Sequence, residues 1–229
     1  MELAQRMVNA TDHAGVKTQV GFMSRFGEAI ERVKALLDNG QAGPPGLMLG
    51  KYFCNSLHSP WWREKEKSGG QIVEQIIHTY DIVRYLLGEP ESVFARIANR
   101  FHQDVERYTS EDVSATVITF KNGAIATVAG TNGAIPGRWI SSYELVAKNL
   151  TVSFADANRA TLTRTNVQPP KVEEIQGSRD ISEAETLDLL DAIEQNRPTR
   201  TPMIEGARTL ELVLAAIRAG ETGEVVQLA

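Results

Sequence analysis

Cysteine is almost absent from this chain, and its scarcity excludes several classes of protein. Cys54 is the one cysteine among 229 residues, so no intramolecular disulfide can form and no zinc site of cysteine thiolates can be assembled. Long apolar runs are also missing, because no stretch approaches the roughly 20 residues that a membrane-spanning helix needs. We therefore expect a cytoplasmic protein that is not associated with membranes.

A surplus of basic residues is missing too. The chain has 24 Lys and Arg against 29 Asp and Glu, which gives a formal net charge of −5. Such a chain offers no basic surface to neutralise phosphates, so nucleic acid is not an expected partner. The rest of the composition, with 42% hydrophobic and 23% charged residues, is ordinary for a folded globular protein with a buried core.

The first part of the chain predicts helices and strands in alternation. Apolar residues recur at helical spacing in 2–14 and again in 27–40, and a glycine ends each segment. Segments 17–23 and 47–55 predict strands. The polar and aromatic stretch 56–70 predicts a loop that lies at the surface or over a site.

Most of the remaining chain predicts strands of one sheet. Alternating or β-branched segments cover 91–101, 112–120, 124–132, 138–148, 150–155 and 159–164. Lys121-Asn122-Gly123 predicts a hairpin turn between two of them. A linker at Pro169-Pro170 precedes helices predicted at 182–194 and 205–219, and 224–229 predicts an edge strand. Helices packed on one face of a large, open, mostly antiparallel sheet define an α+β protein.

The helix predicted at 71–87 carries an acid, an imidazole and a second acid along one line. Apolar residues cover more than half of its circumference, so it should be buried on most sides. Glu74, His78, Asp81 and Tyr85 follow at i, i+4, i+7 and i+11 in the remaining gap. A solvated face with a Glu74–His78 ion pair is one interpretation. The other is a proton-transfer site, in which the carboxylates raise the pKa of His78 and fix its proton-bearing nitrogen.

A metal site is a rival hypothesis for the same residues. Glu74, His78 and Asp81 together with His58 supply ligand types that metals accept. The familiar zinc spacing of two histidines around a glutamate is missing, however. We therefore expect no metal.

The loop before this helix supplies candidate substrate contacts. Trp61, Trp62 and Arg63 could form a sugar platform, because aromatic faces stack on sugar CH groups and arginine binds hydroxyls or a carboxylate. The alternative is that the tryptophans cover the core of the protein itself. Asn55 and His58, just after a predicted strand, are further candidates for polar contacts to a substrate.

Three stretches together resemble the Gfo/Idh/MocA family of sugar and polyol dehydrogenases, which includes glucose-fructose oxidoreductase and inositol dehydrogenase. They are "VGFMSRF" with the helix and "NGQAGPPG" after it, "SGGQIVEQIIHTYDIVRYLLGEPESV", and "LLDAIEQNRPTRTPMIEGARTLELVLAAIRAGETGEVVQL". The resemblance holds in order and spacing and covers essentially the whole chain. It implies a Rossmann domain followed by an open antiparallel sheet domain of the dihydrodipicolinate reductase-like C-terminal type, whose outer face forms a homo-oligomer.

The resemblance divides the chain after residue 22. Residues 1–22 then correspond to the last helix and strand of a Rossmann domain, and 23–229 to the substrate-binding and oligomerisation domain. Met23 and Ser24 fall at the junction of the two, where family members contact substrate. Arg25, beside them, either shares that role or has an ordinary surface or capping role.

The family motif places an aspartate, then a histidine four residues later and a second aspartate three residues beyond. His78 and Asp81 match its last two positions, and Glu74 stands where the family usually has aspartate. The resemblance implies that His78 exchanges the proton of a sugar hydroxyl while hydride passes to NAD or NADP, with help from a lysine in a Glu-Lys-Pro motif. That motif and a G-x-G-x-x-G turn are absent from the sequence, so we expect this chain alone to bind no cofactor.

We therefore expect the substrate-binding and catalytic-histidine domain of an NAD(P)-dependent sugar or polyol dehydrogenase, as a fragment of a longer enzyme. Hydride transfer needs a cofactor positioned against the substrate, so the chain should be inactive without a Rossmann half. One alternative is a non-catalytic dimerisation or ligand-binding module derived from the family. A small metal-dependent enzyme is the other.

Overall fold

The strands of this protein form one large sheet in the computed structural model, which describes residues 1–228. They are β1 (Pro45–Phe53), β2 (Pro90–Ala98), β3 (Val113–Phe120), β4 (Ile125–Thr131), β5 (Ile140–Ala147), β6 (Leu150–Phe154), β7 (Arg159–Arg164), β8 (Lys171–Gln176) and β9 (Val226–Gln227). Their order across the sheet is β8-β7-β6-β5-β1-β4-β3-β2-β9. β1 and β4 are parallel, and the other neighbouring pairs are antiparallel. The predicted α+β class is confirmed.

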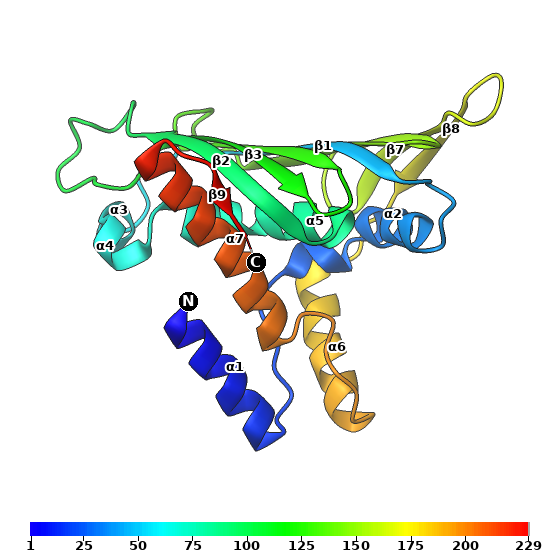
Figure 1. The fold of residues 1–229 in the computed structure, drawn as a ribbon, viewed down its shortest axis with the longest axis horizontal. Helices are drawn as coiled ribbons and strands as arrows, with labels where there is room; N and C mark the ends of the chain where they lie inside the picture. The colour runs from blue at the N-terminus through cyan, green and yellow to red at the C-terminus, as the bar shows by residue number, and fades with distance from the viewer. Residues whose placement is uncertain (229) are drawn as a thin grey trace.

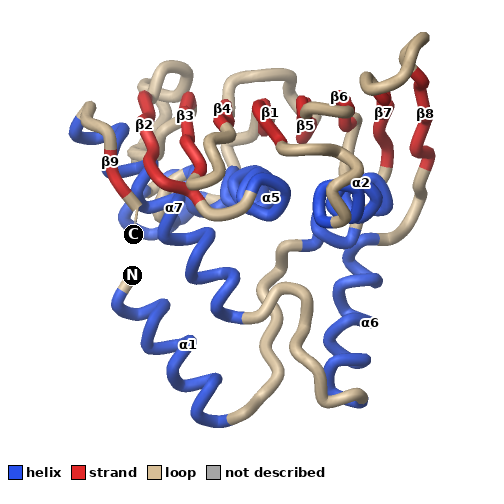
Figure 2. Tube along the Cα trace, turned by 45° about the vertical axis from the view of Figure 1, so that its right-hand side comes forward, coloured by secondary structure: helices blue, strands red, loops and turns tan. Residues whose placement is uncertain are grey.

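The helices lie on one side of this sheet. They are α1 (Glu2–Ala14), the 3-10 turn η1 (Met23–Phe26), α2 (Glu28–Asp38), α3 (Pro60–Arg63), α4 (Lys65–Ser68), the π-turn η2 (Ile72–Ile76), α5 (Ile77–Leu87), α6 (Ile181–Glu194) and α7 (Met203–Thr222). α2, α5 and part of α7 lie against the sheet (Figure 1). α1 and α6 extend away from it, and the opposite face of the central strands is open (Figure 2).

Alternation along the strands separates a core face from the open face. In β4, Ala126 and Val128 are buried toward the helices, whereas Ile125 is 44% exposed. The hairpin predicted at Lys121-Asn122-Gly123 joins β3 to β4, and Gly123 has a φ of +85°, which a turn of this kind favours. The hairpin prediction is therefore confirmed.

A glycine allows the helical segment that carries His78 to approach the sheet closely. Gly130 lies in β4, and a Cβ at this position would be 2.0 Å from Cδ1 of Ile76. Ile76 is fully buried, so it has little room to move aside for a larger residue. The position of η2 over the sheet therefore depends on Gly130.

Some local predictions differ from the structure. Segment 17–23 is not a strand: the backbone N–H of Val20 donates to the carbonyl of Thr201 (2.7 Å), but no ladder forms along this segment in the described residues. Residues 171–176, within the predicted linker, form the edge strand β8. In α1 the apolar Leu3 and Met7 are 70% and 53% exposed, because that side of the helix is not covered.

The last predicted element is confirmed in part. β9 pairs with β2 at the edge of the sheet, and Ala229, the final residue of the predicted strand, lies outside the described residues. Across residues 1–228, no helix combines the length and the apolar character that crossing a membrane requires.

Candidate active site

The helix predicted at 71–87 consists of two segments with different geometry. η2 forms a π-turn, and α5 continues as a regular α-helix. A π-turn contains one more residue per turn than an α-turn, so it rotates the residues before it by about 100° relative to a continuous α-helix. The helix predicted at 71–87 is therefore confirmed in extent, but its first part is a π-turn and not a regular α-helix.

Glu111 holds the start of this π-turn. Its Oε1 accepts a hydrogen bond from the backbone N–H of Ile72 (2.8 Å). Gly70 approaches the same carboxylate with a φ of +91°, and a Cβ there would lie 2.5 Å from Oε2 of Glu111. Burial raises the pKa of Glu111, because a buried carboxylate loses its hydration. Gly70 cannot be replaced by a larger residue without overlap with the carboxylate of Glu111.

His78 lies two residues after the π-turn and is half-buried. It lines a hollow of about 350 Å³ between α1, segment 20–22, α7 and its own helix. The ring of Phe22 stands edge-on to the imidazole, with centroids 6.1 Å apart and planes at 88°. Nδ1 of His78 is buried and has no hydrogen-bond partner among the described residues. One ring nitrogen therefore lacks the partner that usually fixes a tautomer.

Burial lowers the pKa of His78 below its usual value of 6.5, and the charges of Asp81 and Glu74 oppose this shift. An imidazolium loses hydration in such a setting, and here that loss outweighs the attraction of the two acids. The predicted rise of the His78 pKa is therefore wrong, because the net shift is downward. His78 is a neutral imidazole at neutral pH, the form that accepts a proton.

Asp81 is fully buried and is bound by Arg25 and Thr209. Arg25 donates from Nε to Oδ2 (2.8 Å) and from Nη2 to Oδ1 (2.7 Å), which is a bidentate pair. Thr209 donates its hydroxyl to Oδ1 (3.0 Å). The prediction that Asp81 fixes the proton-bearing nitrogen of His78 is not supported by these contacts. Asp81 acts on His78 as a nearby charge.

Glu74 is bound by a residue of α3, one of two short helices within segment 56–70, which is predicted as a loop. Its Oε2 accepts a hydrogen bond from Nε1 of Trp62 (2.5 Å). Trp62 is 2% exposed and its ring packs on His58, with centroids 4.2 Å apart. Trp61 is 50% exposed. Of the predicted sugar platform of Trp61, Trp62 and Arg63, Trp62 is covered by the protein itself, and the contact of exposed Trp61 with a sugar stays a prediction.

Three other residues that are predicted to contact a substrate, Arg63, Asn55 and His58, make hydrogen bonds that stabilise the loop between β1 and η2. The guanidinium of Arg63 donates to the carbonyls of Leu57 (2.8 Å) and His58 (3.1 Å). The side-chain amide of Asn55 donates to a backbone carbonyl of the β4–β5 loop (3.0 Å). Nε2 of His58 lies 3.2 Å from Nε2 of Gln75 in η2. Their contact with a ligand stays a prediction.

The junction near residue 23 contains a charged network that the sequence patterns did not indicate. Arg25 is 2% exposed, so an ordinary surface role is excluded, and Met23 and Ser24 beside it are half-buried. Nη2 of Arg25 also binds Oε2 of Glu205 (3.1 Å), the oxygen that Arg84 binds. A signal was present in the sequence, since Arg84 interrupts the apolar run of α5 and a buried arginine requires a partner.

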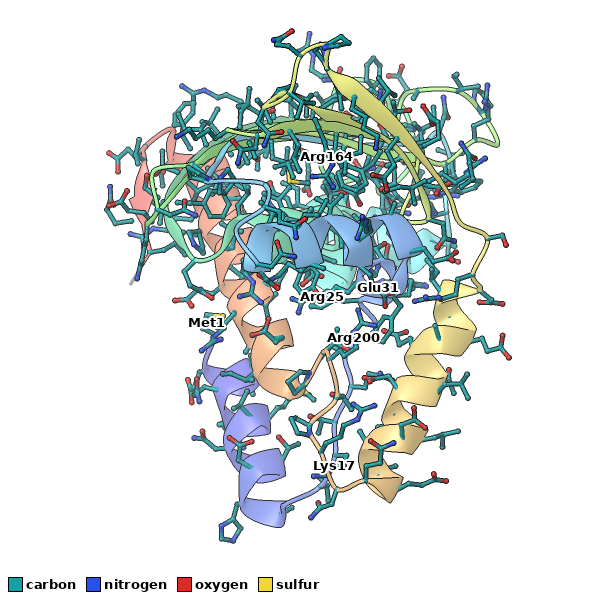
Figure 3. All side chains as sticks on the ribbon, turned by 90° about the vertical axis from the view of Figure 1, so that its right-hand side faces the viewer. Met1, Lys17, Arg25, Glu31, Arg164 and Arg200 are labelled. Atoms are coloured by element: carbon teal, nitrogen blue, oxygen red, sulfur yellow. The ribbon has the colours of Figure 1, made fainter. Side chains whose placement is uncertain are left out.

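The backbone of Arg25 is held as well. Nη2 of Arg200 donates to the carbonyl of Arg25 (2.7 Å), and Nη1 of Arg200 binds Oε1 of Glu31 (2.5 Å). Figure 3 labels these three residues close together, on the side of α2 that faces away from the sheet. η1 is therefore fixed by side chains of α2 and of the segment before α7.

The rival metal hypothesis has no support in the geometry. Over residues 1–228, no group of three or more His, Cys, Asp or Glu side chains is placed to hold a metal ion. His58, Glu74, His78 and Asp81 therefore do not form a ligand set.

Burial raises the pKa of the Cys54 thiol to about 11, so this residue is not a nucleophile at neutral pH.

A family model decides what kind of protein this arrangement belongs to. The model of the GFO/IDH/MocA C-terminal domain matches residues 30–153. This chain belongs to the Gfo/Idh/MocA family. The match runs from α2 into β6 and includes η2 and α5, which carry Glu74, His78 and Asp81. The resemblance inferred from the sequence is thereby confirmed.

Relatives in the Gfo/Idh/MocA family include inositol dehydrogenases. The scyllo-inositol 2-dehydrogenase (NAD(+)) of Bacillus subtilis is 31% identical over 221 residues, which cover 93% of this chain and 63% of that protein. The myo-inositol 2-dehydrogenase of Thermotoga maritima is 28% identical over 133 residues, which cover 58% of this chain and 39% of that protein. The chain thus spans less than two thirds of the length of these relatives.

Solved structures share the fold over the whole chain. An NAD binding oxidoreductase from Klebsiella pneumoniae matches with a TM-score of 0.90 and 19% identity, over 100% of this chain and 70% of that one. Levoglucosan dehydrogenase in complex with NADH and levoglucosan matches with a TM-score of 0.90 and 18% identity, over 99% of this chain and 70% of that one. At such identities the likeness establishes the fold.

Two solved structures that share this fold are complexes with NAD+ or NADH, but the residues described here do not fit a dinucleotide. Its pyrophosphate requires a glycine-rich turn between a strand and the N-terminus of a helix. Within residues 1–228 the one parallel strand pair is β1 and β4, and neither strand leads through G-x-G-x-x-G into a helix. The described residues therefore lack the turn that would hold the pyrophosphate of a dinucleotide.

Proposed function

We propose that this chain is the substrate-binding and catalytic-histidine part of an NAD(P)-dependent sugar or polyol dehydrogenase. Residues 23–229 are its substrate-binding and oligomerisation domain, and 1–22 are the last helix and connecting segment of a nucleotide-binding domain. The observation that carries the proposal is the position of His78, which lines a hollow and has a buried Nδ1 without a partner among the described residues, and burial also lowers its pKa. The inositol dehydrogenases among its relatives favour a polyhydroxylated substrate.

In this proposal His78 takes the proton of a substrate hydroxyl as the carbon that bears it is oxidised. A neutral imidazole is the competent base, and burial keeps His78 neutral. The positive charge that then forms on the ring is stabilised by Asp81 and Glu74, both of which favour imidazolium. The hydride acceptor must be supplied from outside the described residues, so we expect the chain alone to be inactive.

Substrate recognition is assigned to the loop after β1 and to the junction. Trp61 offers an exposed ring face for stacking on a sugar. Asn55 and His58 lie half-buried in the same loop, and Met23 and Ser24 supply contacts from η1. Trp62 and Arg63 contribute indirectly, because their polar atoms bind Glu74 and the loop backbone.

The test separates binding from turnover. Wild type and His78→Asn are titrated with myo-inositol and scyllo-inositol by NMR, and each is assayed with NAD+ and NADP+ by the absorbance of the reduced cofactor. We expect polyol to shift resonances of α5 and of the loop after β1, and no turnover by this chain alone. In a protein that joins the chain to a nucleotide-binding domain, His78→Asn should lower turnover roughly 10²–10⁴-fold. Unchanged turnover would remove His78 from the reaction.

Self-association through the open face of the sheet is a second function that the structure favours. Five aliphatic side chains on the central strands are 39–44% exposed: Leu47, Leu49, Val117, Ile125 and Val146. Leu47 pairs with Ile125 of β4 on one side and with Val146 of β5 on the other. A contiguous exposed apolar surface of this kind indicates an interface. We propose a homo-oligomer, which becomes the main function if the chain acts as a non-catalytic module.

A further inference from the structure

His78 and Asp81 are three residues apart on α5, a spacing at which an imidazole and a carboxylate on one helix can meet. They do not pair. Nδ1 of His78 has no partner among the described residues, while the carboxylate of Asp81 accepts three hydrogen bonds from Arg25 and Thr209. The carboxylate of Asp81 could accept a hydrogen bond from His78 on the same helix, but it is already bound by Arg25 and Thr209.

The side chains that hold Asp81 form a closed ring of hydrogen bonds. Thr209, which donates to Asp81, accepts from Nε of Arg84 (3.1 Å). Arg84 binds Oε2 of Glu205, and the same oxygen binds Nη2 of Arg25 (3.1 Å). Two arginines balance two carboxylates within the ring. Its members come from η1, α5 and α7, so a movement of Asp81 toward His78 would break contacts to two other elements.

Arg25 also reaches His78 through an aromatic contact. Its guanidinium lies 5.7 Å from the ring centroid of Phe22 and 4.6 Å from that of Tyr85. Phe22 in turn stands edge-on to the imidazole of His78. One buried guanidinium therefore contacts both the neighbouring acid and the aromatic ring that borders the histidine.

We infer that Arg25 is a positioning residue for His78, because it holds Asp81 away from the imidazole and supports Phe22 against it. The inference rests on the proposed role of His78 as a base. A direct hydrogen bond between His78 and Asp81 would stabilise the imidazolium and raise the pKa of His78, which reduces the neutral fraction that can accept a proton. The charged groups that act on His78 are Asp81 and Glu74 of its own helical segments. The residues of α1, segment 20–22 and α7 that line the hollow are apolar or glycine.

Arg25→Lys tests this without a change of charge, because lysine keeps the cation but not the bidentate fork. The chain has four histidines, and the spectrum of His78→Asn assigns the relevant resonance. An NMR titration then gives the pKa of His78 in wild type, Arg25→Lys, Asp81→Asn and the double variant. We expect Arg25→Lys to raise this pKa by about one unit, and the rise to vanish when Asp81 is Asn. An unchanged pKa, or an equal rise in both backgrounds, overturns the inference.

Thr209→Val is the second variant, because loss of the buried fork can prevent folding. It changes no charge and removes one of the three hydrogen bonds to Asp81. We expect a smaller rise of the His78 pKa in the same direction, again absent in the Asp81→Asn background. If Arg25→Lys does not fold and Thr209→Val gives no rise, the inference is wrong. Turnover is not a readout here, so a failure of His78 as catalytic base is detected separately by the activity of His78→Asn.

Discussion

Trp62 donates its indole N–H to the carboxylate of Glu74 across 2.5 Å, although the two residues belong to different elements, α3 and η2. The indole is buried and packs on His58. The loop after β1 therefore determines where the carboxylate of Glu74 points. Glutamate is one methylene longer than the aspartate expected from the family motif, and this indole holds the longer side chain in one place.

Replacement of Trp62 by Phe removes the donor while a ring stays in the buried position. We expect a loss of about 1–3 kcal/mol in the free energy of unfolding, from the missing hydrogen bond and the smaller ring. In a double variant, Glu74→Gln should add little to the loss caused by Trp62→Phe, because Trp62 and Glu74 share one interaction. Urea denaturation measures both effects. Trp61→Phe is the matched control, and because Trp61 is 50% exposed it should change stability by less than about 0.5 kcal/mol.

The stability of the protein should fall in acid through His78. Its folded-state pKa lies below the 6.5 of an unperturbed histidine, so the unfolded state binds a proton more tightly. The stabilisation is complete above pH 6.5 and is lost as the pH falls through the folded-state pKa. Burial shifts the pKa of His58 in the same direction. Urea denaturation across this range should show a shallower decline for His78→Asn than for wild type, and identical declines would assign the effect to other groups.

Gly130→Ala should destabilise the protein by about 1–3 kcal/mol, because the new Cβ overlaps Ile76. Ile76→Val in the same chain should restore part of the loss by removing the overlapping methyl. Gly46→Ala in β1 is the control, since a Cβ there meets only the carbonyl of Val146, at 3.8 Å. Equal losses of thermal stability in Gly130→Ala and Gly46→Ala would contradict the close approach of η2 to the sheet.

Leu49→Lys should weaken self-association through the open face of the sheet. Leu49 is 43% exposed and is one of the five aliphatic side chains of the exposed apolar surface on the central strands. A charge buried in an interface at this position is unfavourable. Light scattering coupled to size-exclusion chromatography should show a smaller mass for this variant at equal concentration. Ile193→Lys is the control, because Ile193 is 58% exposed on α6. If Ile193→Lys dissociates the oligomer and Leu49→Lys does not, the interface is at α6.

Much of the fold could be predicted because the patterns that specify it are local. α2 follows from a 3.6-residue apolar period, and the β3–β4 hairpin follows from Lys121-Asn122-Gly123. The π-turn could not be predicted, because the carboxylate that holds its first N–H comes from Glu111, 39 residues further along the chain. β8 was missed because an edge strand with charged residues has no strong apolar alternation.

By itself, the sequence determined that His78 lies on an apolar helix with an acid on either side, and that this row matches a family motif. The tertiary structure decided which partner each acid takes: Trp62 for Glu74, and Arg25 with Thr209 for Asp81. It also decided that His78 is neutral, because burial outweighs the two charges. Spacing along one helix limits which side chains can meet, whereas burial and competing partners arise only when distant segments pack together.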